Sequence, residues 1–155
     1  MKMVLIYDTR SGNTEKMARA IAEGASTIKG VEVEVKKISE KFPLSLLADA
    51  DLAVFGSPVI YADITDGLRS FLEHLKRFIV DGKMSMAGKQ AAIFGSYGYD
   101  GAWIMEARLK QMVGDLGYKV QDRVLVETDS ELRYHADALS RSREFGKQIA
   151  SSLKG

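Results

Sequence analysis

Hydroxyl and glycine residues are concentrated in one short segment near the N-terminus, where they could bind a phosphate group. The segment follows the apolar run 3–7 and consists of Thr9, Arg10, Ser11, Gly12, Asn13 and Thr14. An amphipathic stretch begins directly after it, so we expect a turn from a strand into a helix. A helix N-terminus concentrates unpaired N–H groups and partial positive charge, and a glycine lets the backbone approach an anion closely. The pattern predicts a site for a phosphorylated cofactor; the alternative is a plain turn with an Asn or Thr N-cap.

The residues around this turn indicate which kind of phosphate it would hold. Nucleotide hydrolases place a Lys after the last glycine of the loop, whereas Asn13 follows Gly12 here. A dinucleotide fingerprint needs three spaced glycines and an acidic residue after the second strand, but this turn has one glycine and Lys36 and Lys37 end that strand. The hydroxyl groups instead suit a single terminal phosphate held by hydrogen bonds, with Arg10 as an optional countercharge.

Composition indicates one soluble domain that spans residues 1–155. The chain has 155 residues, is 46% hydrophobic and 28% charged, and carries a net charge of +1. This charge does not favour binding to nucleic acid or to a membrane surface. There is no Cys, which excludes disulfides, a thiolate nucleophile and Cys-based metal sites. The N-terminal apolar run is too short for a signal peptide core or a membrane span, so we expect a cytoplasmic protein.

Strand-like and helix-like periodicities alternate along the chain. Strands are expected at 3–7, 31–35, 51–56, 90–95 and 118–126. Helices are expected at 15–28, 68–79, 105–116 and from His135 to Leu153, with a short helical or looped piece at 44–48. Five strands interleaved with helices predict an α/β fold with a doubly wound parallel sheet covered on both faces.

Three loops should meet at the carboxyl edge of such a sheet, where ligands of open α/β sheets bind. The first is the segment 9–14. The second contains Ser57, Pro58, Val59, Ile60 and Tyr61, and the third contains Ser96, Tyr97, Gly98, Tyr99, Asp100 and Gly101. Their small residues and tyrosines would form two walls around a flat ring, although Gly, Ser and Pro also make ordinary turns.

The three loops together resemble those of the flavodoxin family. The resemblance rests on Thr-x-Ser-Gly-Asn-Thr at 9–14, Gly-Ser-Pro at 56–58 and Gly-Ser-Tyr-Gly-Tyr at 95–99, and it spans essentially the whole chain. The segment 94–101 looks most like the flavodoxin domain of flavo-diiron proteins, here without the diiron half. The uninterrupted last strand is similar to that of short-chain flavodoxins. The resemblance implies five parallel strands in the order 2-1-3-4-5.

The resemblance also implies FMN as the cofactor and electron transfer between redox protein partners as the function. Residues 9–14 would hold the ribityl phosphate, 57–61 would line one face and edge of the isoalloxazine ring, and 96–101 would line the other face. Tyr99 is the first candidate for ring stacking and Tyr97 the second; the alternative for both is rim or core packing. Electron exchange needs no catalytic side chain, so none is assigned.

Two features depart from the family pattern. Many flavodoxins have an aromatic residue and then a glycine in the second loop, where this chain has Ile60 and Tyr61. A bulky residue disfavours the positive φ of that turn by about 1–2 kcal/mol. We therefore expect the one-electron-reduced flavin to be less stabilised than in relatives with the glycine; nearly complete accumulation of that form in a reductive titration would contradict this. The chain is also near neutral, although four acidic residues could ring the site or form an ordinary solvated rim: Asp63, Asp66, Asp100 and Asp129.

Other residues suggest no further chemistry. His74 and His135 have no carboxylate partners at metal-binding spacing, so no metal site is expected. Ser11 lacks the surroundings of a hydrolase nucleophile. Trp103 could pack in the core or shield the pocket. The alternative functions are a reductase of flavodoxin-like fold that takes hydride from NAD(P)H and passes it to flavins or quinones, and a flavin-binding regulatory module. The chain is expected to be a monomer or a weak dimer.

Overall fold

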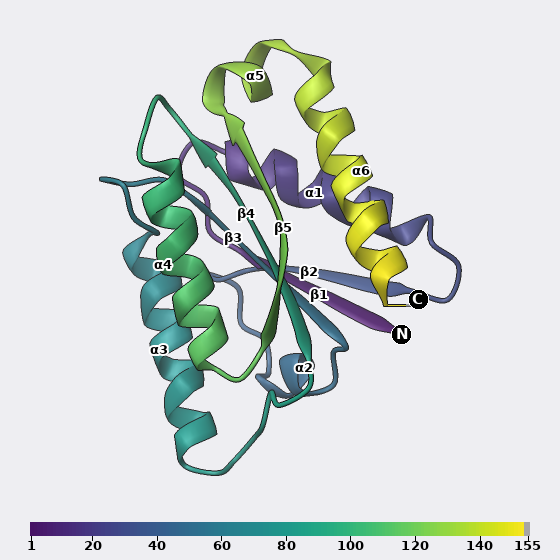
Figure 1. Ribbon diagram of the computed structural model, residues 1–155, viewed down its shortest axis with the longest axis vertical. Helices are drawn as coiled ribbons and strands as arrows, with labels where there is room; N and C mark the ends of the chain where they lie inside the picture. The colour runs from purple at the N-terminus through teal and green to yellow at the C-terminus, as the bar shows by residue number, and fades with distance from the viewer. Residues whose placement is uncertain (154–155) are drawn as a thin grey trace.

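The computed structural model describes residues 1–153 and shows a parallel sheet between two layers of helices (Figure 1). The strands are β1 (Lys2–Tyr7), β2 (Glu32–Lys37), β3 (Leu52–Pro58), β4 (Gln90–Tyr97) and β5 (Lys119–Thr128). The helices are α1 (Asn13–Ser26), α2 (Ser45–Ala48), α3 (Asp66–Val80), α4 (Ala102–Asp115), α5 (Asp129–Tyr134) and α6 (Ala136–Ser152). The order β2-β1-β3-β4-β5 confirms the predicted doubly wound sheet.

The core has two parts, one on each face of the sheet. Alternate residues of a strand point to opposite faces, so Val4 and Ile6 of β1 pack with α3 and α4, whereas Met3 and Leu5 pack with α1 and α6. Figure 1 shows these helix pairs on the two sides of the sheet. The central strands β1, β3 and β4 are apolar on both faces because both faces are covered, which explains their continuous hydrophobic runs.

The strands β3 and β4 are longer than the sequence predicted. The pairing continues through Pro58 opposite Ser96, so Ser57, Pro58, Ser96 and Tyr97 belong to strands rather than to loops. The first helix begins at Asn13, two residues before the predicted start. Ser57, Ser96 and Asn13 were assigned to loops because hydroxyl and amide side chains are also typical of turns.

The C-terminal region contains a helix that the sequence analysis missed. The short helix α5 lies between β5 and α6, and Thr128 caps it by accepting a hydrogen bond from the Glu131 N–H at 3.1 Å. His135 has extended backbone and separates the two helices, so α6 begins one residue after it. Within residues 1–153, no helix combines the length and apolar character needed to cross a membrane.

Candidate functional site

The turn between β1 and α1 forms an open cradle of backbone N–H groups. Gly12 stands at the N-cap of α1 with φ of 91°, and no side chain caps this helix. The Gly12 N–H donates to Thr9 Oγ1 at 3.0 Å, and the Thr9 N–H donates to the Asp8 carboxylate at 2.8 Å. A Cβ atom at Gly12 would have no other atom within 4 Å. An unobstructed helix N-terminus of this kind suits an anion.

Two side chains of the segment 9–14 bind neighbouring elements. Thr14 Oγ1 and Ser96 Oγ are 2.8 Å apart, and both residues are buried. Asn13 is only 3% exposed and donates its amide to Asp129 Oδ1 at 3.1 Å. These bonds fix the cradle against β4 and α5. A hydroxyl that takes part in one hydrogen bond can still make another, so Thr14 can also contact a ligand.

Two side chains of the cradle, Arg10 and Ser11, are exposed at the surface.

A neighbouring hydrogen bond stiffens the first turn of α1, because the buried Tyr7 hydroxyl donates to Glu15 Oε1 at 2.6 Å. This bond lowers the pKa of Glu15 below its ordinary value and, after burial, is the second cause that raises the pKa of Tyr7. Glu15 therefore stays ionised, and Tyr7 stays protonated.

Ser57 fixes the start of the second loop from inside the protein. It is fully buried, its hydroxyl donates to the Pro58 carbonyl at 2.8 Å, and it accepts from the Thr65 N–H at 3.1 Å. Thr65 in turn caps α3 by accepting from the Leu68 N–H. The Val59 N–H donates to the Ser96 carbonyl at 2.9 Å, which joins the second loop to the end of β4. Ser57 thus positions this loop, whereas Pro58, Val59 and Ile60 are half-buried along it.

The second loop ends in a tight turn whose two central residues have positive φ. The Ile60 N–H donates to the Asp63 carbonyl at 2.8 Å, and the Asp63 N–H returns the bond at 3.0 Å. Between them, Tyr61 and Ala62 have φ of 50° and 61°. Left-handed backbone costs about 1–2 kcal/mol for each non-glycine residue. The turn therefore adopts the conformation that the sequence analysis considered unfavourable, and the Tyr61 side chain is fully exposed.

Asp63 connects this turn to two helices. Its carboxylate forms an ion pair with Arg69 of α3, accepts from the Ile64 N–H at 2.8 Å, and lies 3.8 Å from Arg108 Nε of α4. Beside it is a hollow of about 340 Å³. The hollow is lined by Arg10, Ile60, Tyr61, Asp63, Ile64, Asp66 and Arg69. It thus borders both the cradle and the second loop.

The third loop presents its tyrosine to solvent and contacts the second loop. Tyr99 is 95% exposed, and Gly98 and Asp100 are exposed beside it. Gly101 has φ of 82°, and a Cβ atom there would lie 2.9 Å from Ala62 Cα. Because the two loops touch at this point, a side chain at position 101 would separate them. Tyr97 is half-buried at the end of β4.

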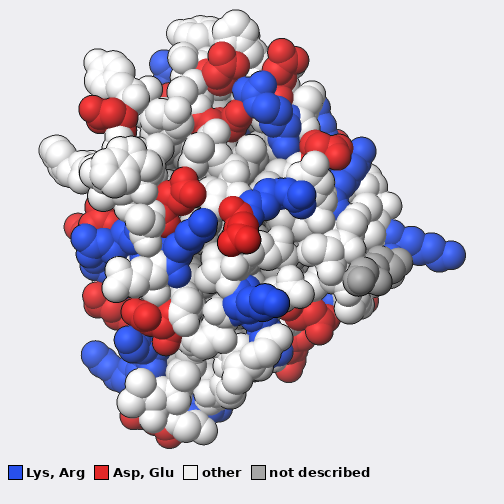
Figure 2. Space-filling model, in the orientation of Figure 1, with Lys and Arg blue, Asp and Glu red and all other residues white. Residues whose placement is uncertain are grey.

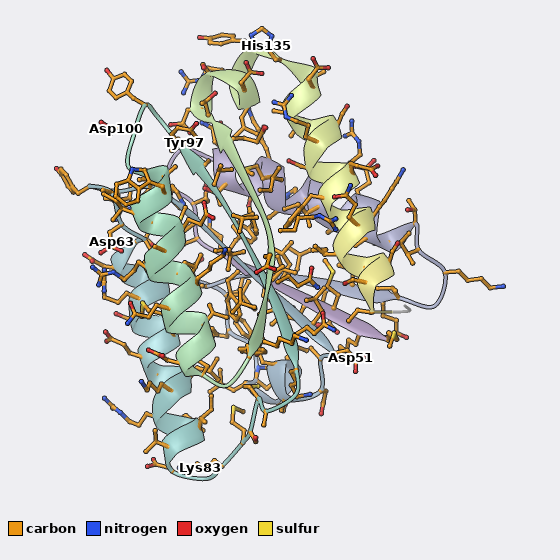
Figure 3. All side chains as sticks on the ribbon, in the orientation of Figure 1. Asp51, Asp63, Lys83, Tyr97, Asp100 and His135 are labelled. Carbon is orange, nitrogen blue, oxygen red and sulfur yellow. The ribbon has the colours of Figure 1, made fainter. Side chains whose placement is uncertain are left out.

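Charged and aromatic residues surround these loops. Figure 3 shows Asp63, Tyr97 and Asp100 toward one end of the molecule, with Asp51 and Lys83 toward the other. Of the four acidic residues considered from the sequence, Asp63 is paired with arginines and Asp129 accepts from Asn13. Trp103 on the first turn of α4 is 73% exposed, which excludes the core position considered for it.

Two residues of the site, Arg69 and Arg108, had no distinctive sequence signal. Asp129 was considered as an acidic residue near the site, but its bond to Asn13 was not predicted because the two residues lie 116 positions apart in the chain. Arg69 and Arg108 contact the second loop from helices whose exposed positions carry many charges. No local pattern around Asp63, which closes its turn, predicts that a cation of α3 pairs with it.

Comparison with known proteins agrees with this geometry. The family model described as Flavodoxin matches residues 5–138. A flavodoxin from the domain Archaea is 28% identical, with complete coverage of both chains and a TM-score of 0.84. Oxidised Flavodoxin 1 from Bacillus cereus is 26% identical over 95% of this chain and 98% of its own, with a TM-score of 0.72.

A likeness in fold extends to a larger protein. The flavodiiron protein from Giardia intestinalis is 18% identical over 97% of this chain and 35% of its own, with a TM-score of 0.79. This chain thus has the fold of one part of that protein. The family match over most of the sequence, together with the sheet order and the cradle after β1, shows that the chain belongs to the flavodoxin family of FMN-binding electron-transfer proteins.

Proposed function

We propose that FMN lies along the carboxyl edge of the sheet, with its phosphate on residues 9–14. The open space in front of Gly12 carries this proposal, because a phosphate can reach the N–H groups of the first turn of α1 only where no side chain stands. The donors fit a phosphate that does not depend on a Lys. Thr9, Ser11 and Thr14 offer hydroxyls, and Arg10 offers an exposed positive charge.

The ring of the flavin would lie between the second and third loops. Ile60 and Tyr61 would line one side, and Tyr97, Tyr99 and Gly101 the other. The exposure of Tyr61 and Tyr99 supports this placement, because a flat aromatic cofactor would cover surface that otherwise meets water. Bound FMN supplies the electron storage, while the protein orients the ring and controls the access of water and partners to it.

Flavodoxin membership implies redox proteins as partners. We propose that this chain carries electrons between a donor and an acceptor protein as a monomer or weak dimer. The loops leave Tyr61 and Tyr99 at the surface, where an edge of the ring would come within electron-transfer distance of a docked partner. No residue is assigned to substrate chemistry.

The test separates an electron carrier from a reductase that accepts hydride. The FMN-loaded protein is mixed anaerobically with NADH or NADPH alone, and the visible absorbance of the flavin is followed. A carrier keeps its flavin oxidised, and then loses the absorbance when a photoreduced deazaflavin supplies electrons. Rapid bleaching by the nicotinamide nucleotide alone would contradict the proposal and favour the reductase.

A further inference from the structure

The turn formed by Ile60, Tyr61, Ala62 and Asp63 has a conformation that its own sequence does not favour. Tight turns with positive φ at both central residues usually contain Asn-Gly, Asp-Gly or Gly-Gly. Here Tyr61 and Ala62 occupy those positions with φ of 50° and 61°. Tyr61 is fully exposed, so packing of its own side chain does not hold it there. Contacts from outside the two residues must stabilise the turn.

Asp63 closes the turn and links it to neighbouring residues. The residue closes the turn through both backbone hydrogen bonds to Ile60, and its carboxylate pairs with Arg69 and accepts from the Ile64 N–H. Arg108 lies farther from the carboxylate, at 3.8 Å. Both partners of the Asp63–Arg69 ion pair are mostly buried, with exposures of 25% and 28%. Solvent therefore screens this pair less than an ordinary surface pair.

Arg69 is itself held on a rigid base. The backbone N–H of Arg69 donates to the Thr65 carbonyl at 3.0 Å in the first turn of α3. The backbone N–H of Thr65 donates in turn to the buried hydroxyl of Ser57. The guanidinium consequently extends from a fixed helix toward the carboxylate. On the other side of the turn, Gly101 lies directly against Ala62.

We propose that Arg69 is a positioning residue that, through Asp63, holds the Tyr61–Ala62 turn in its left-handed form before the flavin binds. This inference rests on the proposed placement of the ring beside that turn. A loop that is already in its bound conformation does not have to be ordered during binding, which increases affinity. Without the ion pair, the turn relaxes toward right-handed backbone, and binding has to reverse that change.

The predicted effect of Arg69→Met concerns the ring and not the phosphate. The variant should bind FMN and riboflavin more weakly by the same factor, roughly five- to thirtyfold, as expected when a left-handed residue loses its support. Fluorescence titration measures both affinities. Arg69→Lys should recover part of the loss, and Arg77→Met, which removes a charge from the last turn of the same helix, should leave both affinities unchanged.

A double-mutant cycle with Ala62→Gly tests whether Arg69 acts through the turn. Glycine accepts positive φ without strain, so in this background Arg69→Met should weaken flavin binding by less than about threefold. NMR of the flavin-free protein gives a direct measurement, since the backbone shifts and three-bond coupling of Ala62 report its φ. In Arg69→Met the signals should move away from the left-handed values, and in Arg77→Met they should not.

Several results would overturn the inference. A loss of FMN affinity without a loss of riboflavin affinity would mean that Arg69 attracts the phosphate. Equal losses from Arg69→Met with and without the Ala62→Gly substitution, or an unchanged Ala62 coupling in flavin-free Arg69→Met, would mean that it does not act through the turn. If the wild-type protein bound neither flavin, the proposed function would fail, and the NMR measurement would still decide the role of Arg69.

Discussion

At the scale of single residues, Tyr99 is an exposed side chain that a flat ligand would cover. It is 95% exposed on the third loop, and its ring has no packing partner to lose when it turns toward a cofactor. Replacement of Tyr99 by Ala should weaken FMN binding by about 1–3 kcal/mol, the range for stacking of an aromatic side chain on a heterocyclic base. Riboflavin should lose the same amount. Tyr134→Ala, at another exposed tyrosine, is the control, and unchanged binding in Tyr99→Ala would exclude stacking.

The bond between Tyr7 and Glu15 makes a pH-dependent contribution to stability. It lowers the pKa of Glu15 in the folded protein below the ordinary value of 4.5. At a pH between the lowered pKa and 4.5, Glu15 therefore binds a proton in the unfolded chain but not in the folded chain. The contribution is fully present above pH 4.5 and is lost as the pH falls through the lowered pKa. Tyr7→Phe should flatten the acid limb of the stability profile in urea unfolding, whereas Tyr134→Phe should not. An identical acid limb in Tyr7→Phe would refute this linkage.

At the scale of elements, the packing of α1 against α6 positions the helix that carries the cradle. A Cβ atom at Gly146 would lie 2.0 Å from the Ile21 carbonyl oxygen, and one at Gly24 would lie 1.9 Å from the Arg143 carbonyl oxygen. Gly146→Ala must therefore push the helices apart and should destabilise the protein by about 1–3 kcal/mol or more. Gly114→Ala in α4 has open space and should stabilise by about 0.5–1 kcal/mol. Equal midpoints of urea unfolding for the two variants would contradict this packing.

The elements also show what the sequence could predict. Hydrophobic runs and helical periodicity identified the five strands and the four long helices, because the two layers impose those patterns directly on the chain. The ends of β3 and β4 were placed too early, because the buried hydroxyls of Ser57 and Ser96 are satisfied by residues at the starts of α3 and α1, which pack against the sheet only in the folded protein. The short helix α5 has too few residues to show a clear period.

The candidate site, like the fold, was only partly predictable from the sequence. The motif 9–14 predicted a turn from a strand into a helix, and the structure shows that turn with Gly12 at positive φ, while phosphate binding there stays a prediction. The left-handed turn at Tyr61 was not expected, because local preference opposes it and the compensating ion pair joins Asp63 to a residue of the following helix. Tertiary contacts here outweigh local propensity, which a reading of the turn sequence alone does not include.

At the scale of the whole molecule, positive and negative charges nearly balance. Figure 2 shows Lys and Arg interspersed with Asp and Glu over the visible face, in agreement with the net charge of +1. Such a surface gives little long-range attraction toward a strongly charged partner. Recognition would then depend on the shape and the exposed aromatic residues around the site, so the convergence of the three loops at one edge of the sheet is the main functional feature of the fold.

A flavin titration tests the proposal that residues 9–14 hold the phosphate of FMN. Wild-type protein, Gly12→Val and Gly88→Val are titrated with FMN and with riboflavin, and the change in flavin fluorescence gives each affinity. Gly88 has φ of 80° and no atom within 4 Å of a Cβ, so its substitution strains the backbone equally in the turn before β4, where that strand begins at Gln90. We expect wild type and Gly88→Val to bind FMN much more tightly than riboflavin, and Gly12→Val to bind both alike. Equal affinities in the wild type, or an FMN preference that survives Gly12→Val, would contradict it.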